Sequence, residues 1–291
     1  MPWCRLYTSR VFESSNRGSP TSLRGWLSDI YVPVLLDDDE DSVLALAHRL
    51  GGKATVDDPI FGRTSGLPAL ERYVAEVSSW LKLHQAKYTK SVFTTGTDRD
   101  VTEGTLVLTF DAKSVELPIA VVAERRRSRE VELRIYYSTQ PIKGTKSVRS
   151  PLVPNDEALT LPPAVTDHIE ALKRGDADAI VLGFEAEGKL RDARGHAHDK
   201  SSGLREFYAK LFDVAASTPP GVSAAAPRRG GVEILKGRAS DDGRNCAFEY
   251  TVIKMHGRDI APQAGLAVYE RGDSGLIRAV RIYDDVETTQ G

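Results

Sequence analysis

The sequence contains little cysteine and no long apolar run. Cys4 and Cys246 are the only cysteines among 291 residues, which is too few for a disulfide framework or for a zinc site built from cysteines. So low a count is typical of a reducing compartment, and we expect a cytoplasmic protein. The sequence also lacks a stretch of about 18 apolar residues that would span a bilayer, so we expect no membrane contact.

An excess of either charge is lacking as well. The 39 lysines and arginines nearly balance the 41 aspartates and glutamates, for a net charge of −2. No overall positive field therefore attracts nucleic acid, and we expect no nucleic-acid partner. The sequence has no Walker A or G-x-G-x-x-G phosphate loop and no G-x-S-x-G motif, which argues against a nucleotide-binding loop and a serine hydrolase.

What is present is the composition of an ordinary globular protein, with 41% apolar and 27% charged residues. At about 150 residues per domain, the length suggests two domains. The first 36 residues differ from the rest, because residues 1–26 hold four arginines against one glutamate. We expect an N-terminal extension here, either a disordered arm or the result of an upstream start codon, with a transit peptide as the alternative.

A helix-then-sheet pattern occupies residues 37–137. Acids at 37–41 precede the helical run 42–50, as the positive end of a helix dipole favours. Apolar residues spaced by three and four predict a second helix over 70–81, and strand-rich runs follow at 105–110, 115–123 and 130–137. One turn carries Arg125, Arg126, Arg127 and Arg129; we interpret it as an exposed hairpin tip, with a phosphate-binding patch as the alternative.

The pattern restarts after residues 139–163, whose five prolines are typical of a linker. We predict helices at 165–172 and 204–215. The strands predicted after them lie at 232–235, 246–254, 265–270 and 276–283.

The two blocks match each other. Residues 120–125 align with 266–271, and Arg134-Ile135-Tyr136-Tyr137 aligns with Arg281-Ile282-Tyr283-Asp284. A repeat of this length is too long for a solenoid unit. The chain is therefore interpreted as a duplicated domain.

Short motifs in both blocks carry a family resemblance. They are Asp57-Asp58-Pro59 and residues 66–70 in the first block, then residues 184–188, 203–208 and the closing strand pair 265–269 and 276–285 in the second. Each block resembles a domain of the nuclear transport factor 2-like (NTF2-like) superfamily, which includes ketosteroid isomerase, scytalone dehydratase, limonene epoxide hydrolase and SnoaL-like polyketide cyclases.

This resemblance implies an α+β fold of two tandem cone-shaped α+β barrel domains. Each domain would be a curved mixed or antiparallel sheet wrapped around helices. We place the first domain at 37–145, the linker at 146–160 and the second domain at 161–291. Such a cone leaves an apolar pocket suited to a small ligand. Pairing of the two domains within the chain, or a homodimer, is expected from the broad outer faces of the sheets.

Ketosteroid isomerase-like and cyclase-like relatives imply a carboxylate that moves a proton beside a carbonyl, without cofactor or metal. An acid in an apolar pocket has a raised pKa, and a tyrosine can stabilise oxyanion charge. We therefore select Glu249, a lone acid in an apolar strand, and Asp284 and Tyr283 at the end of the closing strand as catalytic candidates. The substrate-binding candidates are Tyr250, Gln263, His198 and Arg281.

Several alternatives stay open. Glu249 could instead point outward or pair with Arg281, and Gln263 could be a plain strand-edge amide. His196 and His198 have metal-ligand spacing but no evident third ligand, so no metal is expected. Because the first block has Tyr137 where the second has Asp284, we expect the first to be a degenerate copy.

Three functions fit these candidates. The first is a cofactor-free isomerase, cyclase or dehydratase that acts on a small apolar carbonyl compound in the second domain. The second is a non-catalytic binding or dimerisation module of the same fold. The third is an epoxide hydrolase, which would need an Asp-Arg-Asp relay that only Arg281 and Asp284 suggest.

Overall fold

A computed structural model describes residues 26–126, 130–200, 202–212 and 230–286. The first half contains helices α1 (Leu27–Leu35), α2 (Glu40–Leu50), α3 (Leu67–Leu83) and α4 (Gln140–Lys143) and strands β1 (Thr55–Asp58), β2 (Gly62–Ser65), β3 (Lys87–Thr95), β4 (Arg99–Phe110), β5 (Lys113–Arg125) and β6 (Val131–Tyr136). The predicted helices and strands of this half are all present. The edge strand β3 was not predicted, because its polar residues hide the alternation.

The second half repeats this arrangement. It contains α5 (Pro163–Arg174), α6 (Ala177–Leu182) and α7 (Gly203–Phe212), and strands β7 (Phe184–Arg191), β8 (Ala197–Asp199), β9 (Glu233–Asp241), β10 (Asn245–Met255), β11 (Arg258–Arg271) and β12 (Ile277–Ile282). The sheet orders are β2-β1-β6-β5-β4-β3 and β8-β7-β12-β11-β10-β9. In each, one parallel pair joins an otherwise antiparallel sheet. The predicted α+β fold of two tandem domains is confirmed.

Local sequence explains the start of the first domain. The Asp39 carboxylate caps α2 by accepting from the Asp41 amide, so the acid run is a helix start, as predicted. The helix α1 lies inside the predicted N-terminal extension, yet Leu27, Tyr31 and Leu35 are buried in the first core. The prediction of an extension is therefore corrected for α1, which belongs to the first domain. Its apolar residues are spaced by four, so they share one helical face, and that face packs against the sheet. Residues 1–25 lie outside the described part.

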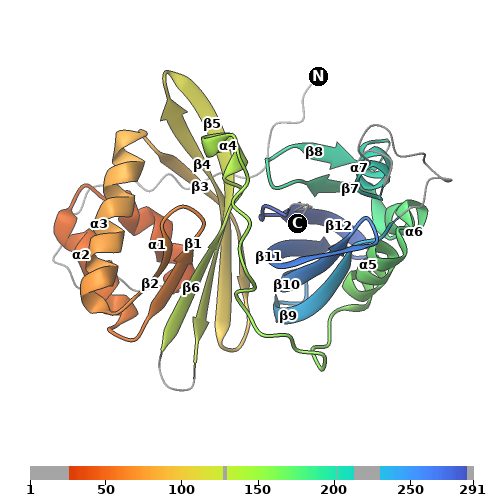
Figure 1. The fold of residues 1–291 in the computed structure, drawn as a ribbon, viewed down its shortest axis with the longest axis horizontal. Helices are drawn as coiled ribbons and strands as arrows, with labels where there is room; N and C mark the ends of the chain where they lie inside the picture. The colour runs from red at the N-terminus through yellow and green to blue at the C-terminus, as the bar shows by residue number, and fades with distance from the viewer. Residues whose placement is uncertain (1–25, 127–129, 201, 213–229, 287–291) are drawn as a thin grey trace.

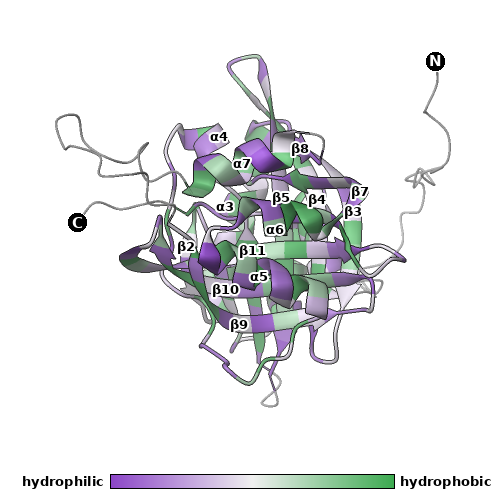
Figure 2. Ribbon diagram, turned by 90° about the vertical axis from the view of Figure 1, so that its right-hand side faces the viewer, coloured by the Kyte–Doolittle hydropathy of each residue, from purple (hydrophilic) through white to green (hydrophobic). Residues whose placement is uncertain are grey.

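The two sheets lie against each other at the centre of the molecule, with α1–α3 outside one and α5–α7 outside the other (Figure 1). Figure 2 looks onto the second domain, where α5–α7 lie over the sheet. Small and apolar side chains of both sheets form one buried cluster between the domains: Val101, Ala120, Val122, Tyr136, Ala247, Leu266, Val268 and Tyr283. The central strands are therefore buried on both faces.

Two buried glutamates also cross this interface in matching positions. Glu103 on β4 faces Ala120 in the register of the first sheet, and Glu249 on β10 faces Leu266 in the second. Each accepts hydrogen bonds from an arginine and a tyrosine of the opposite domain. The duplicated halves thus bind each other reciprocally within one chain.

Candidate functional site

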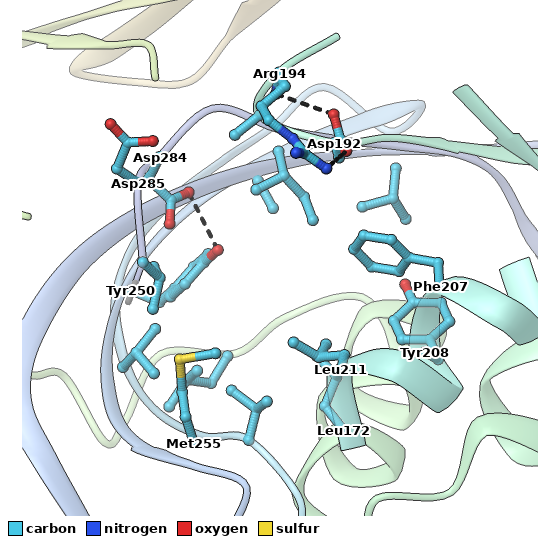
Figure 3. Close-up of a pocket in the computed structure, with 18 of the residues that line it drawn as sticks. Leu172, Asp192, Arg194, Phe207, Tyr208, Leu211, Tyr250, Met255, Asp284 and Asp285 are labelled. Atoms are coloured by element: carbon cyan, nitrogen blue, oxygen red, sulfur yellow. Dashed lines mark hydrogen bonds and ion pairs between the residues drawn. The ribbon is translucent and has the colours of Figure 1, made fainter. Parts of the chain in front are cut away.

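A pocket of about 380 Å³ lies inside the second domain, between its curved sheet and helices α5 and α7 (Figure 3). Its apolar wall comes from Leu172, Phe207, Leu211, Val232, Ile234, Val252, Met255, Ala267, Val280 and Ile282. Polar side chains line it in three places: Asp284 with Tyr250, His168 with Tyr208, and Asp192 with Arg194. Gln140, at the end of the first domain, and Lys146, at the start of the linker, line it as well.

Asp284 is the acid with the most altered environment in this pocket. It follows β12 directly and is only 7% exposed. Its Oδ1 accepts hydrogen bonds from the Leu266 amide at 3.0 Å and from the Tyr250 hydroxyl at 3.4 Å. Burial raises the pKa of Asp284 from its ordinary value of 3.8 to about 7, against the lowering effect of the Leu266 amide and Arg149. Asp284 therefore exchanges a proton near neutral pH.

Tyr250 is held beside this carboxyl by the shape of the neighbouring strand. Gly265 lies opposite Tyr250 in the β10–β11 ladder. A Cβ atom at Gly265 would lie 2.2 Å from the tyrosine ring, so only glycine leaves room for it. Burial and then Asp284 raise the pKa of Tyr250 well above its ordinary value. Its hydroxyl is consequently a neutral donor.

A histidine and a tyrosine form a second polar pair in the pocket wall. His168 on α5 is 5% exposed, and its Nε2 lies 3.2 Å from the Tyr208 hydroxyl on α7. Burial lowers the pKa of His168 to about 3, so the imidazole is neutral at physiological pH. His168 was not selected from the sequence, although it falls in the helical stripe with Val165 and Leu172.

The third polar group is an ionised aspartate that follows β7. Asp192 Oδ1 accepts from the amides of Arg194 and His196 at 3.0 and 2.9 Å. Burial disfavours the charged carboxylate, but the His196 amide and nearby cations lower the pKa of Asp192 below its usual range. His196 and His198 both lie beside it, with ring nitrogens 3.3 and 3.6 Å from Oδ2.

Glu249, Tyr283 and Arg281 do not line this pocket, and their predicted placement is corrected. Glu249 is fully buried between the domains, where it accepts from Arg134 Nε and Arg99 Nη1, each at 2.6 Å. The predicted alternatives were an outward position or a pair with Arg281. Glu249 points away from the pocket, but its partners are Arg134 and Arg99 and not Arg281. Burial raises the pKa of Glu249, but Arg134 and then Arg99 lower it to about 2.

Arg281 and Tyr283 face the same interface from the same sheet as Glu249. Both donate to Glu103 of the first domain, and Arg281 also pairs with Glu270. The Asp-Arg-Asp relay suggested by Arg281 and Asp284 is therefore not formed. The reason is strand alternation, since Arg281 and Tyr283 alternate with Val280, Ile282 and Asp284, which line the pocket.

The two remaining candidates lie near the pocket but do not line it. Gln263 is completely buried on β11. His198, on β8, contacts the Phe207 ring at 4.8 Å and lies behind Asp192. Of the seven predicted site residues, the structure thus brings only Asp284 and Tyr250 to the pocket.

The first domain has almost no corresponding cavity. Its hollow measures about 30 Å³, roughly the volume of one water molecule. Tyr137, which stands where the second domain has Asp284, donates instead to the buried carboxylate of Asp58. Tyr73 and Tyr31 extend this hydrogen-bonded cluster. Aromatic side chains thus fill the first cone.

Two features are absent from the described residues. No group of three or more histidine, cysteine, aspartate or glutamate side chains within them is arranged to hold a metal ion. In the same residues, no helix has both the length and the apolar character needed to cross a membrane.

Known proteins match this chain only distantly. No family model and no curated protein matches the sequence. A solved NTF2-like protein of unknown function from Cytophaga hutchinsonii is 15% identical, with a TM-score of 0.31, and the match covers 44% of this chain and 91% of that one. The likeness concerns the fold alone.

Two further structures give similar matches. A hypothetical protein with a ketosteroid isomerase-like fold from Catenulispora acidiphila, in complex with trimethylamine, is 13% identical with a TM-score of 0.33, over 42% of this chain and 91% of that one. A putative polyketide cyclase from Sinorhizobium meliloti is 18% identical with a TM-score of 0.29, over 38% of this chain and 92% of that one. Such distant NTF2-like matches carry no information on activity.

Proposed function

We propose that the second domain binds a small, mostly apolar carbonyl compound and that Asp284 moves a proton on the carbon beside the carbonyl. One observation carries this proposal: a buried carboxyl with a pKa of about 7 lines an apolar pocket of about 380 Å³. A general base is most effective when its pKa lies near the working pH.

The proton transfer needs only groups of this chain. Ionised Asp284 takes the proton, the C–H bond breaks, and its electron pair moves to the carbonyl oxygen to form an enolate. The neutral Tyr250 hydroxyl donates to Asp284 in the empty pocket; with substrate bound it would turn to donate its one hydrogen bond to that oxygen instead. Asp284 then returns the proton at the same or another carbon, which makes the net reaction an exchange or an isomerisation. If the enolate instead expels a β-hydroxyl, Asp284 gives its proton to that group and water leaves, which makes the net reaction a dehydration.

Binding without chemistry is the competing function, because the same pocket holds a ligand whether or not a proton moves. Deuterium exchange separates the two. The protein is incubated in D₂O with a panel of cyclic ketones, such as cyclohexanone and 2-tetralone, and incorporation at the α-carbon is followed by NMR. We expect protein-dependent exchange that saturates with ketone and rises with pH through about 7, as Asp284 ionises.

The matched pair of variants is Asp284→Asn and Asp273→Asn. The amide of Asp284→Asn keeps an oxygen acceptor for the Leu266 amide but cannot take a proton, so exchange should fall at least 100-fold. Asp273 is an exposed aspartate in the β11–β12 turn of the same domain, and its replacement should leave the rate unchanged. Ketone binding without exchange would support the binding module. Equal exchange in both variants would rule out Asp284.

A further inference from the structure

The side of the pocket across from Asp284 also carries polar groups. Tyr208, on α7, lies across the pocket from Tyr250 and Asp284 (Figure 3). Near it, His168 on α5 and Tyr269 on β11 line the same pocket. The rings of Tyr208 and Tyr269 both contact the His168 ring edge-on, with centroids 5.7 and 5.4 Å apart from it. Two helices and one strand thus bring three polar side chains together.

The hydroxyl of Tyr269 is a hydrogen-bond donor without an acceptor. Burial, and then the nearby Cys246 and Asp284, raise the pKa of Tyr269, so the hydroxyl keeps its proton. It makes no hydrogen bond to any residue that the structure describes. Because the side chain is only 3% exposed, bulk water is a poor substitute for that acceptor. A buried donor without an acceptor is unfavourable, so an oxygen that enters the pocket would bind there.

His168 and Tyr208 have two polar hydrogens but only one hydrogen bond between them. Both side chains are neutral, because burial lowers the pKa of His168 to about 3 and burial together with Tyr269 raises the pKa of Tyr208. The contact between His168 Nε2 and the Tyr208 hydroxyl uses one hydrogen. Whichever group donates, the other hydrogen has no acceptor within the described part of the chain.

The buried Nδ1 atom of His168 shows which hydrogen is left over. Nδ1 is buried and has no partner among the residues described. A buried N–H without an acceptor is rarer than a lone pair without a donor, so we assign the imidazole hydrogen to Nε2, which donates it to the Tyr208 oxygen. The Tyr208 hydrogen is then available to the pocket. His168 is accordingly a positioning residue that orients the Tyr208 hydroxyl.

We propose that the carbonyl compound bound in this pocket carries a second oxygen, which accepts hydrogen bonds from Tyr208 and Tyr269. A ligand of carbon alone at this place would leave both donors unpaired and dry, which is unfavourable. A site built to hydrogen-bond an oxygen also rejects the analogue that lacks it. The ligand is therefore a ketone with a second acceptor oxygen, such as a diketone or a hydroxyketone. This inference rests on the proposed function for the pocket and its carbonyl ligand, but not on the proton transfer.

The probes are trans-decalin-2,6-dione and its analogue 6-methylene-trans-decalin-2-one. The two compounds differ in one oxygen, which the analogue replaces with a CH₂ group. Each is titrated into the full chain, and calorimetry gives its dissociation constant. We define the oxygen preference as the dissociation constant of the analogue divided by that of the dione. In the parent chain this ratio should exceed the factor of two that the symmetry of the dione supplies.

Tyr269→Phe and Tyr208→Phe each remove one donor and keep the ring. Each should lower the oxygen preference about 3- to 10-fold, the value of one neutral hydrogen bond, while the analogue binds nearly as before. Tyr88→Phe, on β3 of the first domain, is the matched control and should leave the preference unchanged. Unfolding curves verify that each variant is folded.

The same ratio tests the positioning role of His168. His168→Gln keeps an N–H that reaches towards Tyr208, so it should retain most of the oxygen preference. His168→Met has a side chain of the same length without a donor, and it should lose about as much as Tyr208→Phe. A purely structural role would weaken both ketones alike and leave the ratio constant, which would refute the positioning role.

Deuterium exchange at the α-carbon, measured on the same samples, separates this inference from the proposed function. A preference that depends on Tyr208 and Tyr269 in the absence of exchange would support the second oxygen and refute proton transfer at Asp284. Exchange with a preference that both variants leave unchanged would overturn this inference alone. The absence of saturable binding of either ketone would overturn both.

Discussion

The hydroxyl of Ser138 donates a hydrogen bond to the buried carboxylate of Asp285, and the two residues stand at equivalent positions after β6 and β12. Asp285 Oδ2 also accepts from the Thr139 amide at 2.7 Å and from the Ser147 amide at 3.1 Å. The end of the second domain's closing strand is thus attached to the first domain, one residue after Asp284. The first domain, whose interior is filled, therefore fixes the position of the segment that carries Asp284 in the second domain.

Removing this attachment should affect both stability and Asp284. Asp285→Ala leaves several buried donors without an acceptor, and we expect it to lower the free energy of unfolding by about 2–4 kcal/mol. Ser138→Ala removes one hydroxyl donor and should cost about 1 kcal/mol. Urea unfolding measures both. The pH midpoint of α-deuterium exchange should move in Asp285→Ala; a midpoint unchanged from the parent chain would show that the attachment is structural only.

The interface glutamates give a second prediction. Glu249→Gln leaves Arg134 and Arg99 buried without their main counter-charge. Removing one partner of a buried ion pair costs about 3–5 kcal/mol, so the urea midpoint should fall strongly. Glu103→Gln, the equivalent change in the other domain, should behave alike because Arg281 loses one of its two carboxylate partners and keeps only Glu270. Glu157→Gln, at an exposed position, is the control. An equally small decrease in the urea midpoint for all three variants would contradict this account.

Acid should weaken the same interface. Burial raises the pKa of Glu249, but Arg134 and Arg99 outweigh it and lower the value from 4.5 to about 2 in the folded protein. Glu249 therefore becomes protonated at a lower pH in the folded state than in the unfolded chain. Its contribution to stability is full above about pH 4.5 and is lost as the pH falls towards 2. Unfolding free energies measured across this range should decrease more steeply for the parent chain than for Glu249→Gln. Parallel curves would refute the assignment.

Glu249 and Tyr250 show why the sequence could not identify every pocket residue. Neighbouring residues of a strand point to opposite faces, and Tyr250 points into the pocket, so Glu249 points to the interface. Alternation alone does not tell which face of β10 lines the pocket, because the strand is apolar both on the face towards the pocket and on the face towards the first domain. Only the packing of Ala247 against the first domain decides it.

Most helices and strands followed from periodicity and the duplication followed from internal matches, both of which depend on short-range order. The cone-shaped α+β fold was implied by the resemblance to NTF2-like proteins. Asp284 was found by its place at the end of the closing strand, and Tyr137 at the matching place indicated that the first block differs. His168 and Asp192 were missed, because their roles depend on helix and strand ends that meet only in three dimensions. The loss of the first cavity depends on how aromatic side chains pack, which no local pattern specifies.

Tyr250 should lose its position if Gly265 gains a side chain. The added Cβ of Gly265→Ala would lie 2.2 Å from the Tyr250 ring, so the ring must move away from Asp284. Because the tyrosine hydrogen bond lowers the pKa of Asp284, its loss should shift the pH midpoint of exchange upward. Tyr250→Phe, which keeps the ring and loses the hydroxyl, should shift it in the same direction. A downward shift in either variant would contradict the contact.

Asp284 also predicts how stability depends on pH. Its pKa is about 7 in the folded protein against an ordinary value of 3.8, because the buried site disfavours the charged form. The folded state thus holds a proton that the unfolded chain releases, so stability is full below about pH 4 and decreases as the pH rises through 7. Asp284→Asn has no proton to lose. Relative to the parent chain it should therefore gain stability between pH 4 and 8, by on the order of 1–4 kcal/mol. Urea unfolding of both proteins at several pH values measures this gain, with Asp273→Asn as the control. A difference that stays constant with pH would mean that Asp284 is ionised as readily as an exposed acid, and it would remove the basis for its role as a proton acceptor.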